Sequence, residues 1–399
     1  CDGGYNFGFV GDDMEYRLEE LFDLQMGKTP SRSVTEYWES GNNKWISIAD
    51  LSKCGKYIYD TKECLSDIAV SESGIKQIPA NTVVMSFKLS IGKTAITSEP
   101  MYSNEAIMSF RDRKLVQLLP EYIYYLLLSK NWDDGTNKAV MGKTLNKATL
   151  SKVKVNIHSM QEQQEIVYVL NQATALIELH QQQLQKLDEL IKARFVELFG
   201  DPLLDDGRYC KAPLGCLAQV GSSKRIFEKE YVSEGIPFYR TKEIVELSNG
   251  NKISTELFIT PKRYNEIRDE YGVPQAGDLL ISAVGTIGVI WIVDGKNDFY
   301  FKDGNLLRVA NSDNFMPVYL KCLLETLICA HKSKMSSGTA YAALTISTLK
   351  EMSVYKVPLA EQSQFSTFVS QVDKSKVAVQ KSLDEAQLLF DSLMQQYFG

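Results

Sequence analysis

Two segments of the chain carry hydrophobic residues at the spacing of a coiled coil. From residue 161 to residue 199 there is no Gly or Pro, and one set of positions recurs every seven residues with a second set three residues later. The first set is Leu170, Ile177, Leu184, Ile191 and Leu198, and the second is Ala173, His180, Leu187 and Arg194. These are the a and d positions of a heptad seam. The pattern predicts one long helix over residues 159–200.

The same pattern returns 199 residues later and predicts a second long helix over residues 358–399. Its two sets are Val369, Lys376, Leu383, Phe390 and Tyr397, and Val372, Val379, Ala386 and Leu393. So narrow a stripe requires one long helical partner, and the other copy is the obvious one. The alternative is a pair of core helices in one large domain. The polar seam residues His180, Arg194 and Lys376 argue against it, because a dry core would have to supply partners for them.

The segments before these helices also repeat, at a separation of 195 to 199 residues. Residues 45–51 correspond to 238–244, each a short strand that leads into a turn, and residues 83–86 correspond to 279–282, each a buried strand. Pro120 and Pro317 each open a short helix. A separation kept over the whole chain indicates a duplication. We therefore predict an α+β protein with two β-rich domains, at residues 1–158 and 201–357, each followed by its long helix. Residues 1–13 match nothing in the second half, so we expect a leader or an added segment without function.

The net charge of −6 argues against a nucleic-acid partner, but the charge is unevenly distributed. Residues 135–158 contain five lysines and no acid, and the corresponding residues 326–350 contain three lysines and no acid. A run of like charges is commonly just a solvated surface. Two runs at equivalent places favour two surfaces that bind phosphate.

Sequence motifs for catalysis are absent. The Gly-Lys-Thr at residues 142–144 matches the end of a phosphate-binding loop, but its spacing is wrong. Six residues separate Gly142 from the upstream Gly135, whereas a phosphate-binding loop needs four. Seven cysteines without a Cys-x-x-Cys spacing and three histidines indicate buried free thiols rather than disulfides or a metal site. No segment is apolar enough to span a membrane or to act as a signal peptide. We expect a cytoplasmic protein that is not an enzyme.

Several short motifs together resemble the specificity (S) subunit of type I restriction–modification systems. They are the Gly-Lys-Thr-Pro-Ser at 27–31 with Tyr37 and Trp38, the strand at 236–244, the Gly-Thr-Ala at 338–340 before Leu344, and the Glu-Gln pairs at 162–163 and 361–362. The resemblance covers residues 15–399, and its strength lies in the order of the motifs, repeated twice. The two halves differ at 141–143 and 340–342, and in this family such differences accompany different target sequences.

The resemblance implies a DNA-reading scaffold without chemistry of its own. Each β-rich domain would be a target recognition domain that reads one half of a bipartite, asymmetric site in double-stranded DNA, and the two helices, antiparallel, would set the spacer. Two methyltransferase subunits would bind the helices and methylate adenine N6 with S-adenosylmethionine, and two restriction subunits, which use ATP and Mg, could join. No cofactor would be bound by this chain. Antiparallel pairing would bring Arg194 within about one turn of Asp373.

Phosphate contacts are expected from the lysines of the acid-free runs and base contacts from polar side chains on adjoining loops. The predicted DNA-binding residues are Lys28, Arg32, Lys143, Asn146 and Lys147 in the first domain and Lys224, Arg225, Arg240, Lys242, Thr339 and Tyr341 in the second. The alternative function is a protein-interaction scaffold in which a coiled coil joins two adaptor domains. Retention of duplex DNA at moderate salt distinguishes the two.

Overall fold

The computed structural model describes residues 14–39, 41–88, 90–132, 137–139, 142–204, 207–335 and 343–399, and of residues 137–139, 142–144 and 335 it describes the backbone alone. Residues 1–13 therefore lie outside the described residues. The chain divides into two compact units, one made of Cys1–His180 and Ser382–Gly399 and the other of Gln181–Lys381. Each unit contains part of both long helices.

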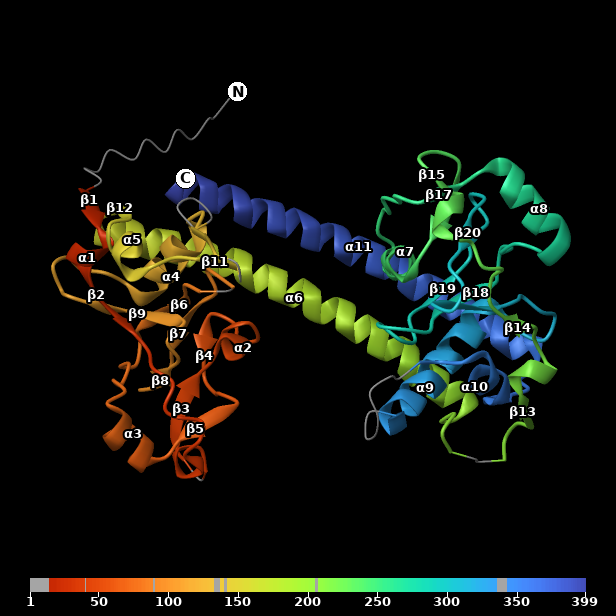
Figure 1. Ribbon diagram of the computed structural model, residues 1–399, viewed down its shortest axis with the longest axis horizontal. Helices are drawn as coiled ribbons and strands as arrows, with labels where there is room; N and C mark the ends of the chain where they lie inside the picture. Colours follow the sequence, from red (N-terminus) through yellow and green to blue (C-terminus); the bar gives the residue numbers. More distant parts are fainter. Residues whose placement is uncertain are drawn as a thin grey trace. The chain divides into compact units, whose positions relative to one another are not determined.

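The long helices are α6 (Met160–Phe199) and α11 (Leu359–Phe398), each of 40 residues, which confirms both predicted helices (Figure 1). Ser159 caps α6: its hydroxyl and its backbone N–H both donate to Glu162, at 2.7 and 2.9 Å. Gly200 ends α6 in the left-handed conformation, with φ of 83°, and its N–H donates to the Val196 carbonyl at 2.8 Å.

Heptad residues of the two long helices share a core within each unit. In the first unit, Leu170 of α6 belongs to the same core as Phe390 and Leu393 of α11. In the second unit, Ile191 near the end of α6 packs in the same core as Val369 near the start of α11, so the helices are antiparallel. The remaining predicted seam residues are buried or half-buried: Ile177, Leu184, Leu187, Val372, Val379 and Leu383.

The expected approach of Arg194 to Asp373 is wrong. Arg194 pairs with Glu197 one turn along its own helix, with Nη1 2.8 Å from Oε2, and its guanidinium lies 5.8 Å from the ring centre of Phe368. Asp373 is exposed. The ion pair that joins the helices here is Lys376 with Asp188, at 2.6 Å. Arg194 has an acid three residues further along its own helix, a spacing that brings the two side chains together.

In the first unit, strands form a five-stranded sheet, a three-stranded sheet and two ribbons. The five-stranded order is β2 (Phe22–Met26), β9 (Ile107–Asp112), β6 (Val83–Ser86), β7 (Thr94–Thr97) and β4 (Tyr57–Ile58). The three-stranded order is β5 (Glu63–Leu65), β3 (Asn43–Ile46) and β8 (Tyr102–Ser103), and the ribbons are β1 (Met14–Arg17) with β12 (Lys154–Ile157) and β10 (Asn137–Ala139) with β11 (Gly142–Thr144). The short helices are α1 (Leu18–Leu21), η1 (Thr35–Tyr37), α2 (Ile48–Leu51), α3 (Asp67–Ser73), α4 (Pro120–Ser129) and α5 (Lys147–Ser151).

The second unit contains two four-stranded sheets and one ribbon. One sheet has the order β14 (Val220–Gly221), β21 (Leu306–Val309), β18 (Leu279–Ser282) and β19 (Ile290–Ile292). The other has the order β15 (Tyr231–Val232), β17 (Phe258–Ile259), β16 (Ile236–Tyr239) and β20 (Tyr300–Phe301), and β13 (Lys211–Pro213) pairs with β22 (Ser353–Tyr355). The helices are η2 (Leu214–Cys216), η3 (Glu228–Glu230), α7 (Thr241–Ser248), α8 (Pro261–Tyr271), α9 (Pro317–Met335) and α10 (Ile346–Glu351).

The two units share strand register as well as strand order. Ser86 of β6 pairs with Ile107, and Ser282 of β18 pairs with Leu306 at the equivalent position. In each unit a middle strand has one antiparallel and one parallel neighbour: β3 lies between β5 and β8, and β16 between β17 and β20. The internal duplication predicted from the sequence is therefore present in the fold.

The predicted turns after the strands at residues 45–46 and 238–239 are wrong, because helices α2 and α7 begin there. Each helix opens with a side chain that satisfies a free backbone N–H. The N–H of Ser47 donates to Asp50, and the N–H of Arg240 donates to Glu243, both at 2.8 Å. The acid three residues after the cap was the sequence signal for a helix start.

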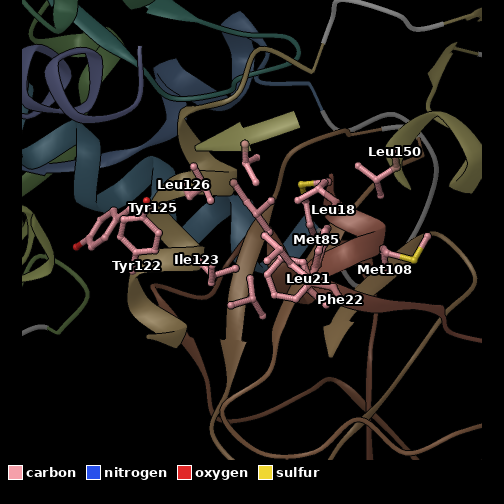
Figure 2. Packing of buried hydrophobic residues seen from close by; sticks show 14 of the residues in the cluster. Leu18, Leu21, Phe22, Met85, Met108, Tyr122, Ile123, Tyr125, Leu126 and Leu150 are labelled. Carbon is pink, nitrogen blue, oxygen red and sulfur yellow. The ribbon is translucent and has the colours of Figure 1, made fainter. Parts of the chain in front are cut away.

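The largest core cluster of each unit lies where its strands and short helices meet the long helices. In the first unit, α1, β2, β6 and β9 pack with α4, as Figure 2 shows for Phe22, Met85, Met108 and Tyr122. The glutamines of the two Glu-Gln pairs are buried beside these cores. Gln163 accepts a hydrogen bond from Leu119 N and donates to the carbonyls of Gln117 and His158, each at 3.0 Å. Gln362 makes the equivalent three bonds with residues 314, 316 and 357.

Candidate nucleic-acid interface

In the first unit, loops that are far apart in the sequence meet where the central strands end. Lys28 N donates to Ser103 O at 2.8 Å, Phe87 N donates to Ala106 O at 2.9 Å, and Leu145 N donates to Phe87 O at 3.0 Å. We call this group, residues 27–32, 86–88, 103–107 and 145–147, the first loop cluster. Its members follow β2, β6, β8 and β11, so the sheets fix their positions.

The second unit has an equivalent group. Ala283 N donates to Asn305 O at 2.8 Å, Leu344 N donates to Ala283 O at 2.9 Å, and the Ser222 hydroxyl donates to Leu306 O at 2.8 Å. We call residues 221–225, 282–284, 302–306 and 343–345 the second loop cluster. Lys302 N also donates to Tyr239 O at 2.9 Å, which brings the start of α7 to its edge.

Two glycine positions show why these loops need particular residues. Gly27 admits no side chain, because a Cβ there would overlap the carbonyl oxygens of Ser103 and Asn104. Gly92 and Gly288, in the hairpin loops after β6 and β18, have φ of 87° and 90°. That conformation favours glycine. In each hairpin the buried Ser86 or Ser282 hydroxyl accepts from the N–H of Lys93 or Val289, at 3.1 and 2.9 Å.

Four of the five predicted DNA-binding residues of the first domain lie on the first loop cluster: Lys28, Arg32, Asn146 and Lys147. Lys28 is exposed, and its ammonium donates to Ser73 O at 2.5 Å. Asn146 caps α5 by accepting from Thr149 N at 2.7 Å, and Lys147 is the exposed first residue of that helix. The side chain of Lys143 lies outside the described residues, although its backbone belongs to β11.

Arg32 is not a free cation. Its two terminal nitrogens bind the two oxygens of Glu63 at 2.6 and 2.9 Å, and its guanidinium lies 3.6 Å from the ring centre of Trp38. The hydrogen bonds to Glu63 raise the pKa of Arg32, and the same bonds lower the pKa of Glu63. The sequence identified the arginine but not its carboxylate partner, which is 31 residues away.

In the second domain the predicted residues divide between the cluster and its edge. Lys224 and Arg225 lie on the cluster: the Lys224 ammonium is 4.7 Å from the ring centre of Tyr271, and Arg225 Nε donates to Asp303 at 2.8 Å. Arg240, at the edge, binds the buried Glu243 through Nε and Nη2, at 3.4 and 2.9 Å. Lys242 is exposed on α7. Thr339 and Tyr341 lie outside the described residues.

Carboxylates from equivalent turns were missed from the sequence. Glu105 in the first unit accepts from the Thr29 hydroxyl, and Asp303 in the second accepts from Arg225. The hydrogen bond from Thr29 lowers the pKa of Glu105, and the positive charges of Lys88 and Arg32 lower it further. Each turn follows a strand that pairs in parallel, β8 or β20, so the repeat itself was the available signal.

Three other kinds of feature are absent among the described residues: a metal site, a disulfide and a membrane-spanning helix. These residues contain no group of three or more His, Cys, Asp or Glu side chains placed to hold a metal ion. The six described cysteines are free, as predicted, but none is fully buried, so that part of the prediction is wrong. Within the same residues, no helix has both the length and the apolar composition needed to cross a membrane.

Comparison with known proteins identifies the class. A model of the type I restriction modification DNA specificity domain matches residues 11–189 and again residues 211–386. The chain therefore belongs to the family of type I restriction–modification DNA specificity subunits. The type I restriction enzyme MjaIX specificity subunit of Methanocaldococcus jannaschii is 26% identical over 95% of this chain and 90% of its own. A putative type I restriction enzyme specificity subunit of Haemophilus influenzae is 29% identical over 69% of each chain.

Solved structures share the fold. The type I restriction–modification S subunit from M. genitalium matches with a TM-score of 0.51 and 15% identity, over 98% of both chains. A chain from a structure that describes assembly and conformational transition of the type I system matches with a TM-score of 0.58 and 16% identity, over 97% of this chain and 98% of that one. Both span the whole duplicated architecture.

Proposed function

We propose that this chain is a DNA-recognition subunit in which each unit reads one half of a bipartite, asymmetric site through its loop cluster. The observation that carries the proposal is that the cluster occurs twice with two equivalent backbone hydrogen bonds, from Phe87 and Leu145 in the first unit and from Ala283 and Leu344 in the second, and with different side chains. Two loop clusters with equivalent backbones can each face one segment of the same DNA duplex. Different side chains on those frames read different bases, so the two half-sites differ.

Within each cluster, exposed lysines such as Lys28, Lys147 and Lys224 serve as phosphate contacts. Phosphate contacts give affinity and orientation, and polar groups on the neighbouring loops contact base edges. The arginines that are held by carboxylates have fixed orientations, which suits recognition of a base better than attraction to the backbone. The net charge of −6 is no obstacle, because each cluster contains more cations than acids: four against one in the first and three against one in the second.

The helices α6 and α11 set the spacer and carry the partner subunits in this proposal. A 40-residue helix is about 60 Å long. Large apolar side chains are exposed on both helices, including Leu176, Leu179, Leu190, Val377, Leu388 and Leu389. Exposed apolar surface on a helix is typical of a protein interface. We assign it to two methyltransferase subunits, which would supply S-adenosylmethionine; restriction subunits, where present, would supply the ATP- and Mg-dependent reaction.

The chain itself performs no catalysis in this proposal and works in the cytoplasm, where the DNA and its partner subunits are. The relatives are named as specificity subunits of restriction enzymes. The alternative of a scaffold that does not bind DNA has no observation in its favour, since it leaves the duplicated cationic loops without a purpose.

Binding of duplex DNA by the assembled complex tests the proposal. The chain is co-expressed with methyltransferase subunits of a type I system, and retention of a DNA library is measured between about 50 and 200 mM salt. We expect a complex that selects one bipartite sequence and loses affinity steeply with salt. A complex that assembles but retains no DNA at the lowest salt would refute the proposal and support the scaffold.

A further inference from the structure

The three arginines predicted to contact DNA differ in how much of each guanidinium is left for a ligand. Arg32 uses both terminal nitrogens on Glu63 and lies against Trp38. Arg240 uses Nε and Nη2 on Glu243, and Nη2 is also 3.8 Å from Glu256. Arg225 uses only Nε, on Asp303, and its side chain is 67% exposed. Within the described part of the chain, neither terminal nitrogen of Arg225 has a partner.

The backbone around Arg225 is fixed on both sides. Lys224 N donates to the hydroxyl of the buried Tyr300 at 2.6 Å, and the following residue, Ile226, is buried. Asp303, the carboxylate that binds Arg225, is also held in place, because its side chain is 19% exposed and it lies in the turn directly after β20. A carboxylate on Nε sets the plane of the guanidinium and directs its two terminal nitrogens away from the anchor.

A guanidinium with two free, parallel N–H groups in a fixed plane matches one base edge. Guanine offers two acceptors, O6 and N7, side by side in the major groove, and bidentate contact by arginine is the commonest specific contact there. Phosphate needs no fixed plane, so the neighbouring Lys224 suits that role.

We propose that Arg225 reads a guanine in the half-site of the second unit and that Asp303 positions it. The inference rests on the proposed function and adds a base identity to it. It also distinguishes the two halves, because the equivalent carboxylate of the first unit, Glu105, binds Thr29 and leaves Arg32 to Glu63. Arg32 therefore lacks the two unpartnered terminal nitrogens that Arg225 offers.

The test compares the sequences methylated by the complete complex with the methyltransferase subunits, carrying wild-type or variant chains. Arg225→Lys keeps the charge and removes the bidentate fork. We expect discrimination at one guanine to fall by about 5- to 150-fold, while the other half-site and the salt dependence stay unchanged. Asp303→Ala leaves the arginine in place and should relax the same position by a smaller factor.

Lys296→Ala is the matched control. It removes an exposed cation that is paired with a carboxylate, Asp294 at 3.1 Å, from the turn after β19. That turn lies beside residue 277, at the opposite end of β18 from the loop cluster. The control should leave the methylated sequence unchanged.

Each outcome decides for or against the proposal. A guanine requirement that persists in Arg225→Lys overturns it, as does equal loss of binding to all sequences, which would make Arg225 a phosphate contact. If Arg225→Lys fails to assemble, Asp303→Ala decides: an unchanged methylated sequence overturns the proposal. A wild-type complex without any defined sequence refutes the proposed function itself, whereas a defined sequence that neither variant alters refutes only the role of Arg225.

Discussion

The buried glutamines at the starts of the long helices each bind three backbone groups of the neighbouring segments. Gln163 satisfies two carbonyls and one N–H of the segments around it, in a site that excludes water. Gln163→Leu leaves these groups unpaired, at about 1–3 kcal/mol each where no relaxation occurs. We expect a loss of at least about 2 kcal/mol in the stability of the first unit, measured by urea unfolding. The exposed neighbour provides the control: Gln164→Leu should change stability by about 0.5 kcal/mol or less.

The lysines of the first acid-free run make a second prediction at this scale. Replacing Lys143 and Lys147 by Ala should weaken binding to all DNA sequences alike and reduce the slope of log affinity against log salt by about one to two. Lys154→Ala is the control, because Lys154 is already paired with Glu15 at 2.5 Å. Loss of specific binding with an unchanged salt slope would show that the two lysines do not contact phosphate.

Residue types could be predicted from the sequence, but their partners could not. Lys28, Arg32 and Lys147 were predicted from the sequence as DNA-binding residues. That Glu63 neutralises Arg32, and that Asp303 holds Arg225, depends on tertiary pairing of strands and turns 31 and 78 residues apart. The same limit explains Gln163: the Glu-Gln pair signalled a helix start, while its three backbone partners come from the fold.

The seam between α6 and α11 carries the prediction at the scale of elements. Lys376 pairs with Asp188, so residue 184 faces residue 380 in the antiparallel seam. Inserting four residues after Leu184 alone breaks the heptad register, and we expect assembly to be lost or the spacer to change. Inserting seven residues after Leu184 and seven after Val379 keeps the register and lengthens both helices by about 10 Å.

The paired insertion should therefore lengthen the spacer of the methylated site by about three base pairs, at about 3.4 Å per pair. Mapping of methylated adenines measures the change. An active paired-insertion complex with the original spacer would show that the helices do not set the distance between half-sites.

The sequence pattern predicted the long helices better than the short ones. The heptads of α6 and α11 were sufficient to predict two long helices because the apolar stripe repeats at 3.5 residues per turn over 40 residues without Gly or Pro from residue 161 to residue 199 of the first. The starts of α2 and α7 were missed because each helix is short and its acid at the third position was attributed to a turn. The seam ion pair was misassigned because several cations and acids lie within one turn of each other, and periodicity alone does not rank them.

For the molecule as a whole, the duplication was the most informative feature of the sequence. It fixed the number of units and the equivalence of strands, since Ser86 and Ser282 occupy the same register. It could not give the separation of the loop clusters or the bases they read. Those depend on side chains that differ between the two halves.

The central claim is that each unit reads its own half of the site. The most direct test exchanges residues 15–158 for the equivalent domain of a relative and maps N6-methyladenine across the genome of a host that carries the complex. We predict that one half of the methylated sequence changes while the other half and the spacer stay the same. A complex that remains active and changes both halves, or neither, would contradict the claim.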